Sequence, residues 1–257
     1  MVRVIKAEIL MLMGELKQYK FNYIFYNISM IIIYIGVLIS FNSEKGSGTV
    51  VLLYGLITWQ LCTSALTYIS SVVEEEAMIG TLEQMFMTRT NIIYIYGAKI
   101  IVNVTFNFIK ALISFLIVIL LFGLWNDFIH IGLENILIML IIIFTVFCFY
   151  ILGLMFGGFA LFYKRIQAFL GIITYVLLFF TNITSPVNEL PVYLKGMSYM
   201  IPMTWATKNI ENIVANNILW NDVIILILIS VLYSIIGVLV FKYYIEKAKV
   251  KGNLGHY

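Results

Sequence analysis

Between two long apolar runs lies the charged stretch Glu74-Glu75-Glu76-Ala77-Met78-Ile79-Gly80-Thr81-Leu82-Glu83-Gln84-Met85-Phe86-Met87-Thr88, which holds four of the thirteen acidic residues of the chain. At 100° per residue this stretch predicts a helix with one apolar side and one polar side. The apolar side comprises Met78, Ile79, Leu82, Met85 and Phe86, and the other side comprises Glu76, Gly80, Glu83, Gln84 and Met87. Such a helix cannot cross a bilayer, but it can lie along the membrane surface and offer its polar side to a soluble partner. A glycine in mid-helix costs about 1 kcal/mol relative to alanine, and close approach of another backbone would explain Gly80.

The rest of the chain is too apolar for a soluble domain. Of its 257 residues, 62% are apolar and only 11% are charged, and several runs exceed the roughly 20 apolar residues that cross a bilayer. We therefore expect an all-α membrane protein, built as a single transmembrane domain over residues 1–257. The six expected spans cover residues 21–41, 49–73, 92–124, 135–162, 166–184 and 222–245. Gly153 and Gly157 form a small-xxx-small pattern that permits close helix packing.

Two further segments have a mixed composition. Residues 1–20 alternate basic and apolar groups, which predicts a helix lying at the cytoplasmic surface of the membrane. Residues 185–221 contain all three prolines of the chain, and proline bars a continuous spanning helix there. We expect short helices in the outer leaflet or outside it, packed against protein.

The basic residues indicate how the chain is oriented. With both termini in the cytoplasm, the segments inside the cell carry twelve Lys and Arg residues and the external segments carry three. This asymmetry follows the positive-inside rule, and it places the 74–90 segment in the cytoplasm of a multi-pass protein of the cell membrane. The external basic residues are Lys45, Lys195 and Lys208, and the internal ones are Arg3, Lys6, Lys17, Lys20, Arg89, Lys99, Lys164, Arg165, Lys242, Lys247, Lys249 and Lys251.

Two motifs resemble a known family. Acidic residues followed by Gly80-Thr81-Leu82-Glu83, a short apolar run and Thr88 are similar to the signature of the type-2 exporter permeases of ABC transporters. The family carries a Pro–Leu-Pro–Pro-Leu-Thr pattern before its last span, and the matching residues here are Pro186, Leu190-Pro191 and Pro202-Met203-Thr204.

The resemblance implies that residues 74–90 form the cytoplasmic coupling helix, which docks on an ATPase subunit. The residues expected to take part are Glu76, Gly80, Thr81, Leu82, Glu83 and Gln84. It also implies a complex of two permease subunits, the same or related, with two ATPase subunits. No nucleic-acid partner is expected.

The chain lacks the sequence features of an ATP-binding enzyme. It contains no G-x-x-x-x-G-K-[ST] phosphate loop, so we expect ATP and Mg²⁺ to bind a separate ATPase chain and no cofactor to bind this one. Its two histidines stand alone and its two cysteines lie in predicted spans, which predicts no metal site. We therefore expect a transport subunit that is not itself an enzyme.

A row of polar residues interrupts the third span. Asn103, Asn107, Lys110 and Ser114 follow the spacing i, i+4, i+7, i+11 and therefore share one helix face. In one interpretation they line the substrate path, with Lys110 meeting an anionic substrate or a lipid headgroup. In the other, Lys110 extends to the cytoplasmic interface and the amides bond to neighbouring helices.

These observations predict a permease subunit that exports an amphipathic small molecule, a peptide or a lipid-linked compound. The alternative is an ATP-independent secondary transporter or channel. A coupled carrier usually places an acidic group inside a span, and none lies well inside a predicted span here. A passive channel would not need the acidic amphipathic segment. An intramembrane transferase would need clustered acids or a histidine near the interface, and the sequence offers neither.

Overall fold

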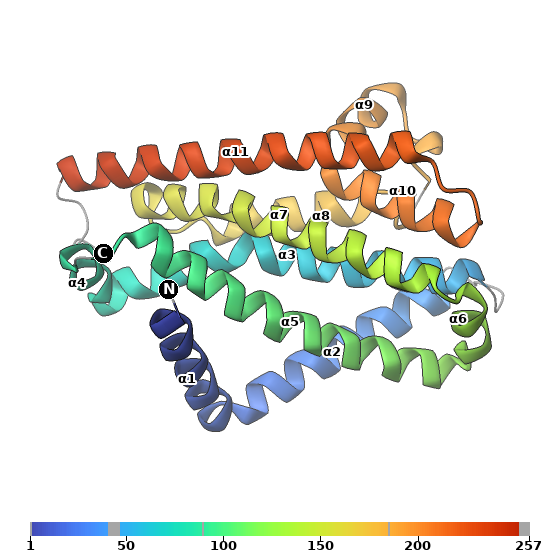
Figure 1. Ribbon diagram of the computed structural model, residues 1–257, viewed down its shortest axis with the longest axis horizontal. Helices are drawn as coiled ribbons and strands as arrows, with labels where there is room; N and C mark the ends of the chain where they lie inside the picture. Colours follow the sequence, from blue (N-terminus) through green and yellow to red (C-terminus); the bar gives the residue numbers. More distant parts are fainter. Residues whose placement is uncertain (1, 41–46, 89, 185, 252–257) are drawn as a thin grey trace.

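The backbone of this computed structural model is helical over nearly all the residues it describes, which are 2–40, 47–88, 90–184 and 186–251. These residues form eleven α-helices and one short 3-10 helix, η1, with no strand among them (Figure 1). The elements are α1 (Val2–Gln18), α2 (Lys20–Ser40), α3 (Ser47–Ile79), α4 (Thr81–Met87), α5 (Ile92–Phe122), α6 (Trp125–Ile131), α7 (Glu134–Tyr163), α8 (Gln167–Phe180), η1 (Val187–Glu189), α9 (Val192–Met200), α10 (Pro202–Val214) and α11 (Trp220–Lys251).

Five of the described helices are long and apolar enough to cross a membrane, namely α2, α3, α5, α7 and α11. This confirms the expectation of an all-α membrane protein. The helix α8 is apolar but has 14 residues, and at 1.5 Å per residue it is about 21 Å long. That length is less than the roughly 30 Å of a hydrocarbon core, so a sixth span over 166–184 stays a prediction.

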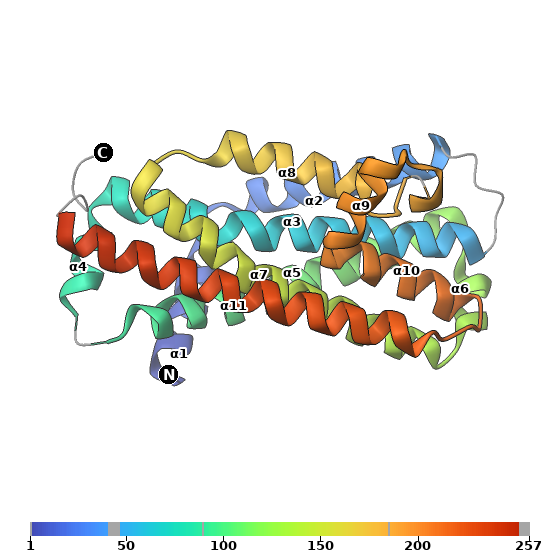
Figure 2. The same ribbon diagram turned by 90° about the horizontal axis from the view of Figure 1, so that it is seen from above.

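The long helices lie side by side and give the molecule two distinct ends. In both views α4 lies at one end together with the last turns of α11 (Figures 1 and 2). The helix α6 and the start of α11 lie at the opposite end. The external position expected for Lys45 and the internal positions expected for Arg89 and for the last residues of the chain fall outside the described residues.

The centre of the molecule is a close packing of α3, α7 and α11, made possible by glycine. A Cβ atom added at Gly153 of α7 would lie 2.6 Å from the backbone oxygen of Ala65 in α3. One added at Gly237 of α11 would lie 2.5 Å from the backbone oxygen of Ile151. These backbones come so close that no side chain fits between them. In a membrane, where burying apolar groups gives little gain, such contacts hold helices together.

The helices α1 and α2 form an arm beside this centre. In Figure 1, α1 runs across the direction of the long helices, and α2 then runs obliquely across α5. The helix α2 contacts both α3 and α5. Only Tyr34 and Leu38 of α2 are buried, whereas α7 buries residues along its whole length. The arm is therefore attached to the molecule much less closely than the central helices are to one another.

The segment 185–221 contains η1, α9 and α10. Pro191 precedes α9 and Pro202 lies in the first turn of α10, where a missing N–H costs nothing. The helix α10 is amphipathic and packs its buried side on α3, α7 and α11. On α9, by contrast, Tyr193 and Met197 are largely exposed.

Candidate functional site

The segment 74–90 is not one helix. Its first residues continue α3 as far as Ile79, and the chain then turns sharply at Gly80, which has φ 80° and ψ 5°. Side-chain-bearing residues avoid this left-handed region, whereas glycine adopts it freely. A Cβ atom at Gly80 would meet nothing within 4 Å in this chain. The expected mid-helix position of Gly80 is therefore wrong, and Gly80 is the hinge between α3 and the seven-residue helix α4. Close approach of a backbone from another chain stays a prediction.

The helix α4 has one buried and one exposed side. Leu82 is 2% exposed and fixes α4 to the rest of the chain, with Met85 packed beside it against the core. Glu83 and Gln84 point to the surface. Met78, which helical periodicity places on the same apolar side as Leu82, is 57% exposed. The turn at Gly80 changes the direction of the helix, so the apolar residues before and after it do not form one stripe.

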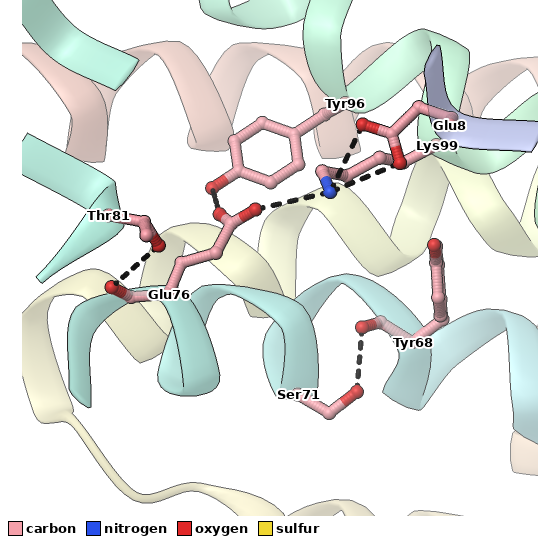
Figure 3. A network of polar contacts seen from close by, with 7 residues as sticks. All are labelled: Glu8, Tyr68, Ser71, Glu76, Thr81, Tyr96 and Lys99. Carbon is pink, nitrogen blue, oxygen red and sulfur yellow. Dashed lines mark hydrogen bonds and ion pairs between the residues drawn. The ribbon is translucent and has the colours of Figure 1, made fainter. Parts of the chain in front are cut away.

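Glu76 faces inward and not toward a docking surface. Its carboxylate accepts a hydrogen bond from the Tyr96 hydroxyl at 2.8 Å and lies 3.3 Å from the Lys99 ammonium (Figure 3). The same ammonium lies 3.2 Å from the carboxylate of Glu8. The Glu76 side chain is therefore held by partners inside the chain, and the expected contact of Glu76 with an ATPase stays a prediction.

This cluster of Glu8, Glu76, Tyr96 and Lys99 joins three helices. Glu8 lies on α1, Glu76 on α3, and Tyr96 and Lys99 on α5. Thr81 adds α4, because its hydroxyl donates to the backbone oxygen of Glu76 at 3.3 Å. Burying an ammonium group is costly unless carboxylates compensate its charge, and the Lys99 side chain is 9% exposed. In the sequence, Lys99 counted only as one of the basic residues that indicate the orientation of the chain in the membrane, and no local pattern pointed to this cluster.

A cavity of about 480 Å³ lies beside this cluster, between the arm and the helices α3, α4 and α5. Asn103, Asn107 and Lys110 of the polar row line it. Ser114 is not among the lining residues; it is 1% exposed and donates to the backbone oxygen of Lys110 at 3.0 Å. The expected path residue Ser114 is therefore placed inside the packing around α5, away from this cavity.

The polar row is fixed by contacts with two other helices. The Tyr150 hydroxyl of α7 donates to Asn103 at 2.6 Å and accepts from Asn107 at 3.1 Å. The Lys110 ammonium lies 4.7 Å from the ring centre of Phe106 and 5.3 Å from that of Tyr26. Aromatic faces attract cations, so these rings hold the ammonium at the cavity wall.

The described residues hold no group of three His, Cys, Asp or Glu side chains that could bind a metal ion. Cys62 and Cys148 are both buried and unbridged. The cavity offers charged groups, amides and aromatic rings, which suit the binding of an amphipathic molecule.

Comparison with known proteins identifies the family to which this structure belongs. A family model described as ABC-2 type transporter matches residues 6–215, a range that contains the Gly80 hinge, α4 and all the helices around the cavity. No curated protein matches the chain. Since the match covers most of the 257 residues, the chain belongs to the ABC-2 type transporter family, as a membrane-spanning permease subunit.

Proposed function

We propose that this permease is the membrane part of an ATP-driven exporter and that α4 docks on a separate ATPase subunit. The observation that supports this best is the form of α4. It is a short helix at one end of the molecule (Figures 1 and 2), bent away from α3 by Gly80, fixed by Leu82 and presenting Glu83 and Gln84 outward. A helix anchored in this way can transmit a push from a soluble partner.

The push would pass from α4 to the cavity through the cluster of Glu8, Glu76, Tyr96 and Lys99. Thr81 connects α4 to Glu76, and Lys99 connects Glu76 to Glu8 on α1. Because α1 forms one wall of the cavity, a displacement of α4 would move that wall. ATP hydrolysis would thereby change the access of an amphipathic small molecule, peptide or lipid-linked compound to the cavity.

The remaining parts of the transporter lie outside this chain. The ATPase subunits would bind ATP and Mg²⁺, and a second permease subunit, identical or related, would complete the complex. We place the complex in the cell membrane with α4 on the cytoplasmic side, as the distribution of basic residues indicates.

The test is recovery of the ATPase with the tagged permease, followed by measurement of ATP hydrolysis. Glu83→Lys reverses an exposed charge on α4 and should reduce the co-purified ATPase about tenfold, because like charges at an interface repel. Glu189→Lys makes the same change on exposed η1 and should have no effect. A variant of Gly80 is unsuitable, since any side chain at its φ would disturb the hinge.

Equal ATPase recovery and hydrolysis for the wild type, Glu83→Lys and Glu189→Lys would contradict docking at α4. Transport by the purified permease without ATP or ATPase would instead support the secondary transporter or channel.

A further inference from the structure

The cavity beside the arm contains charged groups that have no oppositely charged partner. Glu15 and Glu75 line it, as does Lys110. Within the part of the chain that the structure describes, neither carboxylate forms an ion pair with a basic side chain, and Lys110 forms none with a carboxylate. By contrast, Glu8 and Glu76 of the same cavity share the ammonium of Lys99.

One tyrosine contacts two of these charges. The Tyr23 hydroxyl donates to Glu15 at 3.3 Å, and its ring packs edge-on against Phe106 with the centres 5.8 Å apart. The Lys110 ammonium lies 5.9 Å from the centre of the Tyr23 ring. The hydroxyl end of Tyr23 therefore meets an acidic part of the cavity lining, and its ring meets a basic part.

The charge of the lining disfavours a simple anion. Four carboxylates and two ammonium groups line the cavity, and two of the carboxylates share Lys99. An anionic ligand at Lys110 would face the unpaired Glu15 and Glu75, whereas a cationic ligand at those residues would face Lys110. A ligand that carries both charges would find a partner for each of them.

The apolar part of the lining suits an alkyl chain. Met11 and Leu12 of α1 and Val102 of α5 contribute apolar side chains to the cavity lining. Met11 is also 56% exposed, so it lies at the rim, where the cavity meets the outer surface of α1. A chain bound along these residues could continue out of the cavity into the surrounding bilayer.

We propose that this cavity binds a zwitterionic amphiphile, with its anionic group at Lys110 and its ammonium group at Glu15 and Glu75. Aromatic faces also favour the ammonium group, above all a quaternary one. The proposal deepens the proposed function by naming the class of compound that enters this cavity. A membrane phospholipid and an exported compound share this chemistry.

Binding to the purified permease without ATPase tests the site separately from ATP-driven export. Three probes share a dodecyl chain: dodecylphosphocholine, dodecyl phosphate and dodecyltrimethylammonium. With the permease in maltoside micelles, native mass spectrometry measures how much of each probe is bound. We expect dodecylphosphocholine to bind about tenfold more tightly than either of the probes that carry charge of one sign only, because it alone has a partner for both the acidic and the basic groups of the cavity. Equal affinity for all three probes would overturn the proposal.

Variants that remove charge test which residues of the cavity bind the anionic group of the ligand and which bind its ammonium group. Lys110→Met should weaken dodecylphosphocholine and dodecyl phosphate about tenfold and leave dodecyltrimethylammonium unchanged or tighter. The double variant Glu15→Gln with Glu75→Gln should show the opposite selectivity. Lys242→Met and Glu246→Gln, both on exposed positions of α11, are the matched controls and should change none of the affinities.

Loss of all three probes to the same extent in both variants would also overturn the proposal, because it would show that charge does not select the ligand. If Lys110→Met does not fold, Lys110→Gln removes the charge while keeping a polar group, and the same selectivity is expected.

A last measurement distinguishes the two sources of the ligand. A phospholipid that co-purifies with the wild type and is lost in Lys110→Met would support a bound membrane lipid. ATP-dependent transfer of a labelled phosphocholine amphiphile by the reconstituted complex would support an exported compound. Failure to recover an ATPase would contradict the proposed function while leaving the binding selectivity measurable.

Discussion

The two sides of this permease are built in opposite ways. The helices α3, α7 and α11 pack so closely that glycine is required at their crossings. The arm of α1 and α2 leaves a cavity of about 480 Å³ against α3, α4 and α5. The packed side contacts its neighbours through backbone, whereas the arm contacts them mainly through a few polar and aromatic side chains. Because the centre is closely packed, the other side of the molecule can remain open and charged.

The packed helices and the arm should also differ in how easily they move. Packed helices resist sliding, because any shift opens voids or forces atoms together. An arm held by one ionic cluster and by few buried side chains can move when that cluster is displaced. We therefore expect conformational change to concentrate in α1, α2 and α4, and three substitutions test how sharply the two sides differ.

The largest effect is expected from Lys99→Met. It removes the cation between Glu8 and Glu76, whose side chains are 16% and 12% exposed. Two carboxylates would then face each other with little solvent. Removing one partner of a buried ion pair costs about 3–5 kcal/mol, and we expect the lower end of that range here because some solvent reaches both acids. The free energy of unfolding in bicelles measures the loss.

Two further variants check the reason for this loss. Adding Glu8→Gln and Glu76→Gln to Lys99→Met removes all the charges of the ion pairs, and most of the stability should return. Lys242→Met, on an exposed position, should change the free energy of unfolding by less than about 0.5 kcal/mol. A stable Lys99→Met protein would show that the arm does not depend on this cluster.

A somewhat smaller loss in the free energy of unfolding is expected from Gly153→Ala in the packed centre. The new methyl group would lie 2.6 Å from the backbone oxygen of Ala65, and α3 and α7 would have to separate. Overfilling a packed region costs about 1–3 kcal/mol. The control is Gly97→Ala in α5, where an added Cβ meets nothing within 4 Å. Equal behaviour of the two alanine variants would show that the α3–α7 contact at Gly153 is not close enough to exclude a methyl group.

Much of this architecture could be predicted from the sequence, because it follows from local patterns. Apolar runs mark the long helices, and the Gly153–Gly157 spacing marks a close crossing. The three prolines mark the segment of short helices before the last long helix. On α4, the buried Leu82 and exposed Glu83 follow directly from helical periodicity.

The errors of the prediction have two physical causes. Helical periodicity assumes one continuous helix, but the chain leaves the helical conformation at Gly80, whose φ is 80°. It therefore misplaced Met78, which the hinge leaves exposed. The second cause is distance along the chain. Glu76 is paired with Lys99 and, through it, with Glu8, and no local pattern predicts which distant segment will supply a partner.

The smallest effect is expected from Tyr150→Phe, which tests the border between the two sides. The Tyr150 hydroxyl of α7 donates to Asn103 at 2.6 Å and accepts from Asn107 at 3.1 Å, and both asparagines lie on α5. Removing the hydroxyl leaves the bond between the two amides, at 2.7 Å, intact. Hydrogen bonds between membrane helices contribute about 0.6 kcal/mol each on average, so the two lost bonds should cost about 1 kcal/mol. The free energy of unfolding measures this, with Tyr175→Phe, whose ring is 63% exposed, as the matched control. A loss as large as that of Lys99→Met would mean that α5 belongs to the packed centre.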